Sequence, residues 1–179
     1  MIPLVIVACE VSFWVLVGLG LLARYVVRRR RTGTALLAMT PVVDLVLLAV
    51  VVVDLRDGGT ATTFHGLAAV YLGVSLAYGH RMITWADGRF AHRFAGGPAA
   101  PTPYGREHTR ACWQDVARTA VAVGIAAATL WGLITLVGDP TRTDPLLGVV
   151  GMLGLWFAVD LVWAVAHTIS PRRPPAVRV

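Results

Sequence analysis

The chain contains no lysine and no asparagine, and it has few charged residues of any kind. Only 15% of its 179 residues are charged, whereas soluble globular domains carry about a quarter. All sixteen basic residues are therefore arginines, and the formal net charge is +6. With 56% hydrophobic residues and a mean hydropathy of +0.68, the composition is typical of an integral membrane protein and not of a soluble domain.

Cysteine is also scarce. The topology described below puts Cys9 in the outer part of a membrane span and Cys112 on the cytoplasmic side, so these two cysteines cannot pair within one chain, and no disulfide framework is expected.

The sequence also lacks a nucleotide-binding loop, a nucleophile elbow, an HExxH motif and a paired-cysteine zinc motif. We therefore predict that the protein is not an enzyme.

Five long apolar runs dominate the sequence. They cover about residues 2–25, 35–55, 64–85, 114–137 and 146–169. Each is long enough to cross the hydrocarbon core of a bilayer, which takes about 20 helical residues. The runs are continuous and not alternating, which favours helices, whose backbone polar groups are satisfied internally. The sequence predicts an all-α integral membrane bundle of five transmembrane helices over residues 1–169, followed by a basic cytoplasmic tail at 170–179.

Arginines outside these runs lie almost entirely on one side. Eleven fall on that side: Arg28, Arg29, Arg30, Arg31, Arg89, Arg93, Arg106, Arg110, Arg172, Arg173 and Arg178. Arg56 and Arg142 fall on the other. The positive-inside rule then places the N-terminus outside and the C-terminus in the cytoplasm. Because these arginines flank apolar spans, we expect them to contact the bilayer and its anionic lipid headgroups, and not nucleic acid.

Small residues recur at helical spacing in two runs, which allows helix backbones to approach closely. The stripes are Ala69, Gly73 and Ala77, then Gly124, Ala128 and Gly132. They predict association with a second copy or with a membrane partner; the alternative is chance in a chain rich in glycine and alanine. Residues 87–94 are predicted to extend the third span as a helix, and 96–103 to form a loop.

Acidic side chains at membrane depth are costly and are candidate functional residues. With a rise of ~1.5 Å per residue, Glu10, Asp44 and Asp160 lie ~12, ~16 and ~21 Å from the outer boundary of a core ~30 Å thick. Such a stepped set, with Arg81 near the cytoplasmic interface, is one way to build a proton or cation relay. The alternative is that each acid is tied down structurally by Arg81, a Tyr, a Trp or a backbone group.

Asp44 follows a proline inside the second run. Pro41 removes one helix hydrogen bond and exposes the carbonyl of Leu37. Broken helices near the middle of a membrane often form ion or substrate sites. The alternative is a tolerated kink with Asp44 hydrogen-bonded to a neighbour.

Histidines supply two further candidate sites. His80 and His167 both lie toward the cytoplasmic side, as expected of a pair that ligates one haem iron; the alternative for His167 is an interfacial side chain. His108, Cys112 and Asp115 share a face if a helix begins near Gly105, and they are ligand types for zinc or another transition metal. The alternative there is an ordinary amphipathic lead-in to the fourth span.

Four short stretches resemble the YmcC-like small membrane proteins of bacteria. They are residues 40–45 (TPVVDL), 65–71 (HGLAAVY), 85–87 (WAD) and 104–105 (YG). The resemblance covers most of the chain and implies a location in the bacterial membrane, but no chemistry. We predict an accessory or structural subunit of the plasma membrane without a cofactor. The alternatives are a proton- or cation-coupled carrier or channel, and a haem-binding redox protein.

Overall fold

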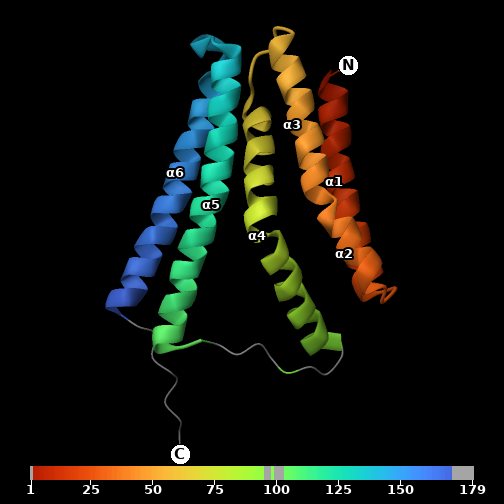
Figure 1. Ribbon diagram of the computed structural model, residues 1–179, viewed down its shortest axis with the longest axis vertical. Helices are drawn as coiled ribbons and strands as arrows, with labels where there is room; N and C mark the ends of the chain where they lie inside the picture. The colour runs from red at the N-terminus through yellow and green to blue at the C-terminus, as the bar shows by residue number, and fades with distance from the viewer. Residues whose placement is uncertain (1, 95–97, 99–102, 171–179) are drawn as a thin grey trace, which may run out of the picture.

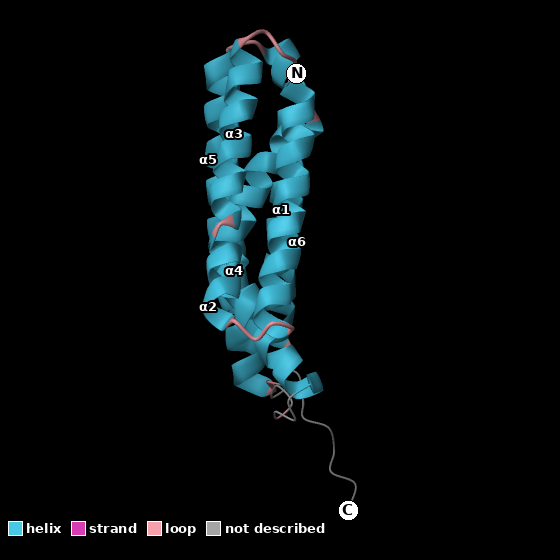
Figure 2. Cartoon of the chain, turned by 90° about the vertical axis from the view of Figure 1, so that its right-hand side faces the viewer, coloured by secondary structure: helices cyan, strands magenta, loops and turns pink. Residues whose placement is uncertain are grey.

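A computed structural model describes residues 2–94, 98 and 103–170, apart from the side chains of residues 2–7, 9, 10 and 94. This part of the chain is helical, without strands. The helices are α1 (Ile2–Tyr25), α2 (Arg30–Ala38), α3 (Thr40–Arg56), α4 (Thr63–Phe94), α5 (Gly105–Val137) and α6 (Pro140–Ile169). The helices run along one long axis (Figure 1), and the turns that join them gather mainly at its two ends (Figure 2). The predicted all-α class is confirmed.

Long apolar helices confirm the prediction of transmembrane segments. Among the described residues, three stretches are long and apolar enough to cross a membrane: Arg30–Arg56, Gly105–Val137 and Pro140–Ile169. A shorter apolar stretch, Val11–Tyr25, forms the second part of α1. α4 is not among them, and it carries His65, His80 and Arg81 within its apolar sequence.

Three helices extend beyond the apolar spans predicted for them. α4 continues through residue 94, as predicted for the helical extension, and α5 begins at Gly105. α6 begins at Pro140 and not near residue 146, because Asp139 caps it: its Oδ1 accepts the N–H of Thr141 at 2.9 Å. The Thr141 hydroxyl also donates to Asp139, and these hydrogen bonds lower the pKa of Asp139. The predicted loop at 96–103 lies mostly outside the described residues.

The second apolar run is divided into two helices. α2 ends at Ala38 and α3 begins at Thr40, with Met39 between them. Pro41 occupies the first turn of α3, where its missing N–H leaves no intrahelical acceptor unpaired. The hydroxyl of Thr40 donates to the carbonyl oxygen of Leu37 at 2.8 Å. The carbonyl that the proline was predicted to expose is therefore hydrogen-bonded within the break.

α4 lies in the middle of the bundle. It packs against α3 on one side and α5 on the other, while α1 packs against α2 and α3, and α6 packs against α5. Figure 1 shows the α1–α2 turn, the end of α4, the start of α5 and the end of α6 at one end of the molecule. The arginine-rich segments of the described chain therefore share one end, hereafter the arginine-rich end.

The α4–α5 interface is a close backbone contact at Gly73. A Cβ atom placed on Gly73 would lie well inside van der Waals contact of the Ala122 carbonyl oxygen and 3.4 Å from the Cβ of Ala126. Ala69, from the same predicted stripe, is fully buried. The second stripe is different: Gly124, Ala128 and Gly132 are exposed on the outside of α5. Of the two stripes, only the first packs against another helix in the described part of the chain.

Candidate functional site

Asp44 is buried between α3 and α4. Asp44 is 1% exposed, and its Oδ2 accepts a hydrogen bond from the hydroxyl of Ser75 at 2.7 Å. α3 supplies the acid and α4 supplies the hydroxyl. Because hydroxyl–carboxyl contacts between helices have no competition from water in an apolar interior, this contact ties the two helices together.

Asp160 ends a chain of hydrogen bonds across three helices. The hydroxyl of Thr119 on α5 donates to Oδ2 of Asp160 on α6. The Thr119 oxygen lies 2.6 Å from the hydroxyl of Tyr78 on α4. The Tyr78 hydroxyl also donates to the carbonyl oxygen of Asp115 on α5 at 3.4 Å. Thr119 is fully buried, whereas Tyr78 and Asp160 are half-buried.

Asp115 lies nearer the arginine-rich end and is surrounded by arginines. It forms an ion pair with Arg81 of α4, whose second nitrogen donates to Oδ2 at 3.1 Å. Arg118, one turn further along α5, donates to Oδ1 at 3.1 Å. The side chains of all three are more than a third exposed, so solvent screens these pairs and they contribute little to stability.

A cavity of about 470 Å³ opens beside these groups. Its polar and aromatic lining consists of Tyr78, Arg81, Asp115, Trp156 and Asp160. The indole of Trp156 stacks beside the Tyr78 ring with centroids 6.4 Å apart. A second cavity of about 300 Å³ lies on another side of α4, among apolar side chains of α1, α2 and α4. The first cavity combines charge and volume and is therefore the candidate site.

The predicted relay residues occupy separate contacts. The Glu10 side chain lies outside the described residues. Asp44 meets Ser75 between α3 and α4, and Asp160 meets Thr119 between α5 and α6, so the two acids belong to different helix interfaces. Arg81 is bound to Asp115 and not to a relay acid. The partners are side-chain hydroxyl groups, and not the Arg81, Tyr, Trp or backbone group that the alternative named. The relay and its structural alternative both stay predictions.

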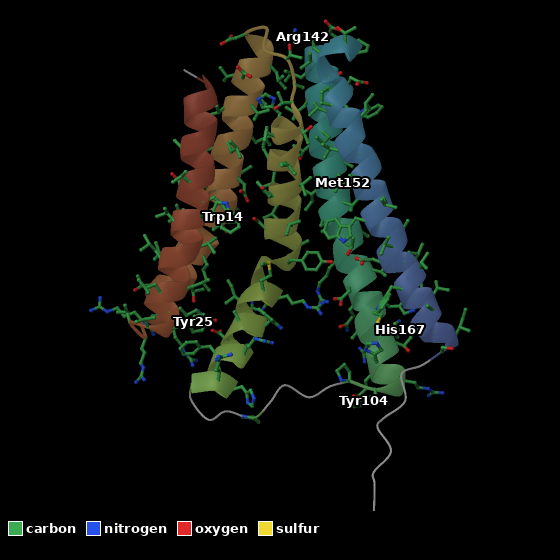
Figure 3. All side chains as sticks on the ribbon, turned by 180° about the vertical axis from the view of Figure 1, so that it is seen from behind. Trp14, Tyr25, Tyr104, Arg142, Met152 and His167 are labelled. Carbon is green, nitrogen blue, oxygen red and sulfur yellow. The ribbon has the colours of Figure 1, made fainter. Side chains whose placement is uncertain are left out.

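His80 and His167 lie in different surroundings. His80 is exposed on α4. His167, labelled at the arginine-rich end in Figure 3, lies between α5 and α6, and its ring is 4.7 Å from that of His108. The described contacts therefore pair His167 with a histidine of α5. Shared haem ligation by His80 and His167 stays a prediction.

The predicted metal-ligand set is partly assembled. The Cys112 sulfur lies 3.8 Å from Nε2 of His108, as helical spacing predicts. Asp115 is instead occupied by Arg81 and Arg118. The third group that the structure brings to this pair is His167. No local spacing could reveal it, because it depends on the antiparallel packing of α5 and α6.

A further polar cluster, which sequence reasoning missed, holds the opposite end together. Arg142 of α6 donates from one terminal nitrogen to the carbonyl oxygens of Leu55 and Gly59, both at 2.6 Å (Figure 3). His65 accepts the N–H of Thr62 at its Nδ1, and its Nε2 lies 3.5 Å from Asp54. These contacts pin the α3–α4 connection to α6.

The whole chain has a close counterpart among bacterial membrane proteins. Over 172 residues it is 39% identical to the uncharacterised membrane protein YmcC of Bacillus subtilis (strain 168), and the match covers 96% of this chain and 93% of that protein. No protein-family model matches the chain, and no solved structure matches it. The resemblance predicted from four short stretches is confirmed.

Proposed function

Because this chain belongs to the same family as the bacterial membrane protein YmcC, we propose that it is an accessory or structural subunit of the bacterial plasma membrane. It crosses the bilayer five times, with its N-terminus outside and its C-terminus in the cytoplasm. Its membrane-depth acids act as packing contacts between helices and carry out no catalysis.

Complete pairing of the buried polar groups is the observation that carries this proposal. Among the described residues, no buried side-chain nitrogen or oxygen lacks a hydrogen-bond partner. Asp44 and Asp160 each meet a hydroxyl of a neighbouring helix. Polar side chains that hydrogen-bond across helices contribute to helix association in a membrane. The paired state therefore favours the structural role.

Exposed apolar surface supports a partner within the membrane. The second small-residue stripe on α5, Gly124, Ala128 and Gly132, is exposed, and nothing in the described part of the chain lies within 4 Å of a Cβ placed on Gly124 or Gly132. Small residues are enriched where transmembrane helices associate. This face of α5 is where we expect a second copy or a different membrane subunit to pack.

A double-mutant cycle tests the packing role. Asp160→Leu, Thr119→Val and the double variant are compared in detergent by their free energies of unfolding. We expect a coupling energy of ~0.6 kcal/mol, up to ~1.7, as measured for other hydrogen bonds between membrane helices. Asp44→Val with Thr119→Val is the control pair, because these residues share no contact. No coupling at Asp160 and Thr119 would remove the packing role of that pair.

A second candidate function is a proton- or cation-coupled carrier or channel that uses Glu10, Asp44 and Asp160. The observation in its favour is the 470 Å³ cavity, which Asp160 and Arg81 line. Asp160→Asn keeps the shape of the side chain and removes its charge. For a carrier, this variant in proteoliposomes loses ion flux at unchanged thermal stability, whereas Asp144→Asn, an exposed acid near the other end, retains flux. For a structural subunit, the wild type shows no flux above empty liposomes.

A further inference from the structure

Three side chains meet where the start of α5 lies beside the end of α6. They are His108, Cys112 and His167, whose potential ligand atoms all lie within 4.8 Å of one another. His108 and Cys112 are one helical turn apart on α5, so their side chains share a face. His167 comes from the last turn of α6. Two neighbouring contacts hold these helix ends together: the Thr109 hydroxyl donates to the His167 carbonyl, and the Trp113 indole to Thr168.

The geometry is close to that of a tetrahedral metal site. Ligand atoms bound at ~2.0–2.3 Å around a tetrahedral zinc ion lie ~3.3–3.6 Å apart. The measured distance between the Cys112 sulfur and Nε2 of His108 is 3.8 Å. All three ligand atoms lie within 4.8 Å of one another, so the side chains would move closer together to coordinate one ion.

His167 makes the hydrogen bond that is typical of a metal-ligating histidine. Its Nδ1 lies 2.9 Å from the carbonyl oxygen of Trp163. A carbonyl oxygen accepts only, so Nδ1 carries the proton and Nε2 keeps its lone pair. A histidine that ligates a metal commonly donates its other ring N–H in this way, which fixes the tautomer and the ring orientation.

The donor set also selects the class of metal. It contains a thiol and two imidazoles but no carboxylate, because Asp115 is bound to arginines. Hard cations such as Mg²⁺ and Ca²⁺ bind oxygen ligands, whereas thiolate and imidazole suit zinc and related transition metals. Cys112 is 9% exposed, so the site is largely shielded from solvent.

We propose that His108, Cys112 and His167 form a binding site for Zn²⁺ or a similar transition-metal ion, which joins the ends of α5 and α6. Three protein ligands leave a fourth position for water. The site differs from the sequence-predicted set in one ligand, since His167 replaces Asp115. It is independent of the proposed packing role of Asp44 and Asp160.

Co²⁺ titration of the full-length chain in detergent tests the proposal, because cobalt replaces zinc and gives a visible spectrum. A Cys9→Ser background removes the other thiol. We expect one Co²⁺ per chain, a sulfur-to-cobalt charge-transfer band in the near ultraviolet, and loss of the spectrum when Zn²⁺ is added. Absence of this band in folded protein would overturn the proposal.

Single variants test the ligand set. Cys112→Ser should abolish the charge-transfer band, and His108→Gln and His167→Gln should each weaken binding by more than ~100-fold, beyond the ~10–100-fold that loss of an outer-shell partner costs. His167→Cys supplies another ligand and should retain binding, which separates ligand loss from misfolding. Asp115→Asn and His80→Gln are matched controls that should bind as tightly as the wild type. Equal weakening by Asp115→Asn and His167→Gln would contradict the assignment.

Discussion

Single hydroxyl groups decide how the buried acids of this protein are held. Ser75 and Thr119 each donate to a carboxylate of another helix, Asp44 or Asp160. The acids are predictable from sequence because charge at membrane depth is rare. Their hydroxyl partners are not, because an isolated Ser or Thr in an apolar run has no distinguishing pattern and its partner lies 31 or 41 residues away.

The ion pair between Arg24 and Asp87 makes stability depend on pH. Arg24 of α1 donates from Nε to Oδ1 of Asp87 at 2.6 Å, and the Tyr25 hydroxyl donates to the same oxygen at 2.8 Å. Asp87 lies just beyond the predicted third span, which ends at Trp85. The guanidinium of Arg24 holds the pKa of Asp87 below its ordinary value of 3.8. The contact therefore joins the ends of α1 and α4 whenever Asp87 is ionised.

The lowered pKa of Asp87 determines whether stability rises or falls with pH. A carboxyl group with a lower pKa in the folded state stabilises the fold above its unfolded pKa, and the contribution is lost as pH falls through the folded pKa. We expect the wild type to be more stable than Asp87→Asn at neutral pH, and the difference to shrink below pH 3.8. Thermal unfolding in detergent over this range measures it. Asp57→Asn, an exposed acid near the other end, is the control; a difference that stays constant with pH would contradict the prediction.

At the scale of helices, close backbone approach organises α4. Gly73 allows the α4 backbone to reach the carbonyl oxygen of Ala122 on α5. The same spacing of small residues on α5, at 124, 128 and 132, faces outward. The sequence predicted both stripes equally well. Which stripe packs within the chain depends on the rotation of each helix about its axis, and that is set by all its contacts together.

Gly73→Ala should destabilise the bundle. A methyl group there would overlap the Ala122 carbonyl, which is backbone and cannot rotate away. Overpacking of this kind costs ~1–3 kcal/mol. Gly88→Ala is the matched control, because this glycine lies exposed on the same helix with nothing within 4 Å of its Cβ position, and alanine favours helix by up to ~1 kcal/mol over glycine. Midpoints of denaturant unfolding compare the two, and equal midpoints would argue against this contact.

At the scale of the whole molecule, the arginine distribution and the helix arrangement agree. The helix ends that adjoin the arginine-rich segments of the described chain lie together (Figure 1). Arg142, at the other end, donates hydrogen bonds to the carbonyl oxygens of Leu55 and Gly59. A positively charged end is the one that the positive-inside rule retains in the cytoplasm.

Thiol labelling tests this orientation. In a background of Cys9→Ser and Cys112→Ser, Asp57→Cys places a thiol at the α3–α4 turn and Arg106→Cys places one at the start of α5. We expect a membrane-impermeant thiol reagent to label position 57 in intact cells and position 106 only after permeabilisation. Labelling in the reverse order would overturn the proposed orientation.

The sequence by itself determined that this is a helical membrane protein, because its long apolar runs are continuous and not alternating, and a helix satisfies its backbone polar groups internally in lipid. It also singled out Asp44 and Asp160, and the one-turn spacing of His108 and Cys112. Only the tertiary structure decided their partners. Ser75, Thr119 and His167 come from other helices, and such pairings depend on helix rotation and antiparallel packing, which local spacing does not encode.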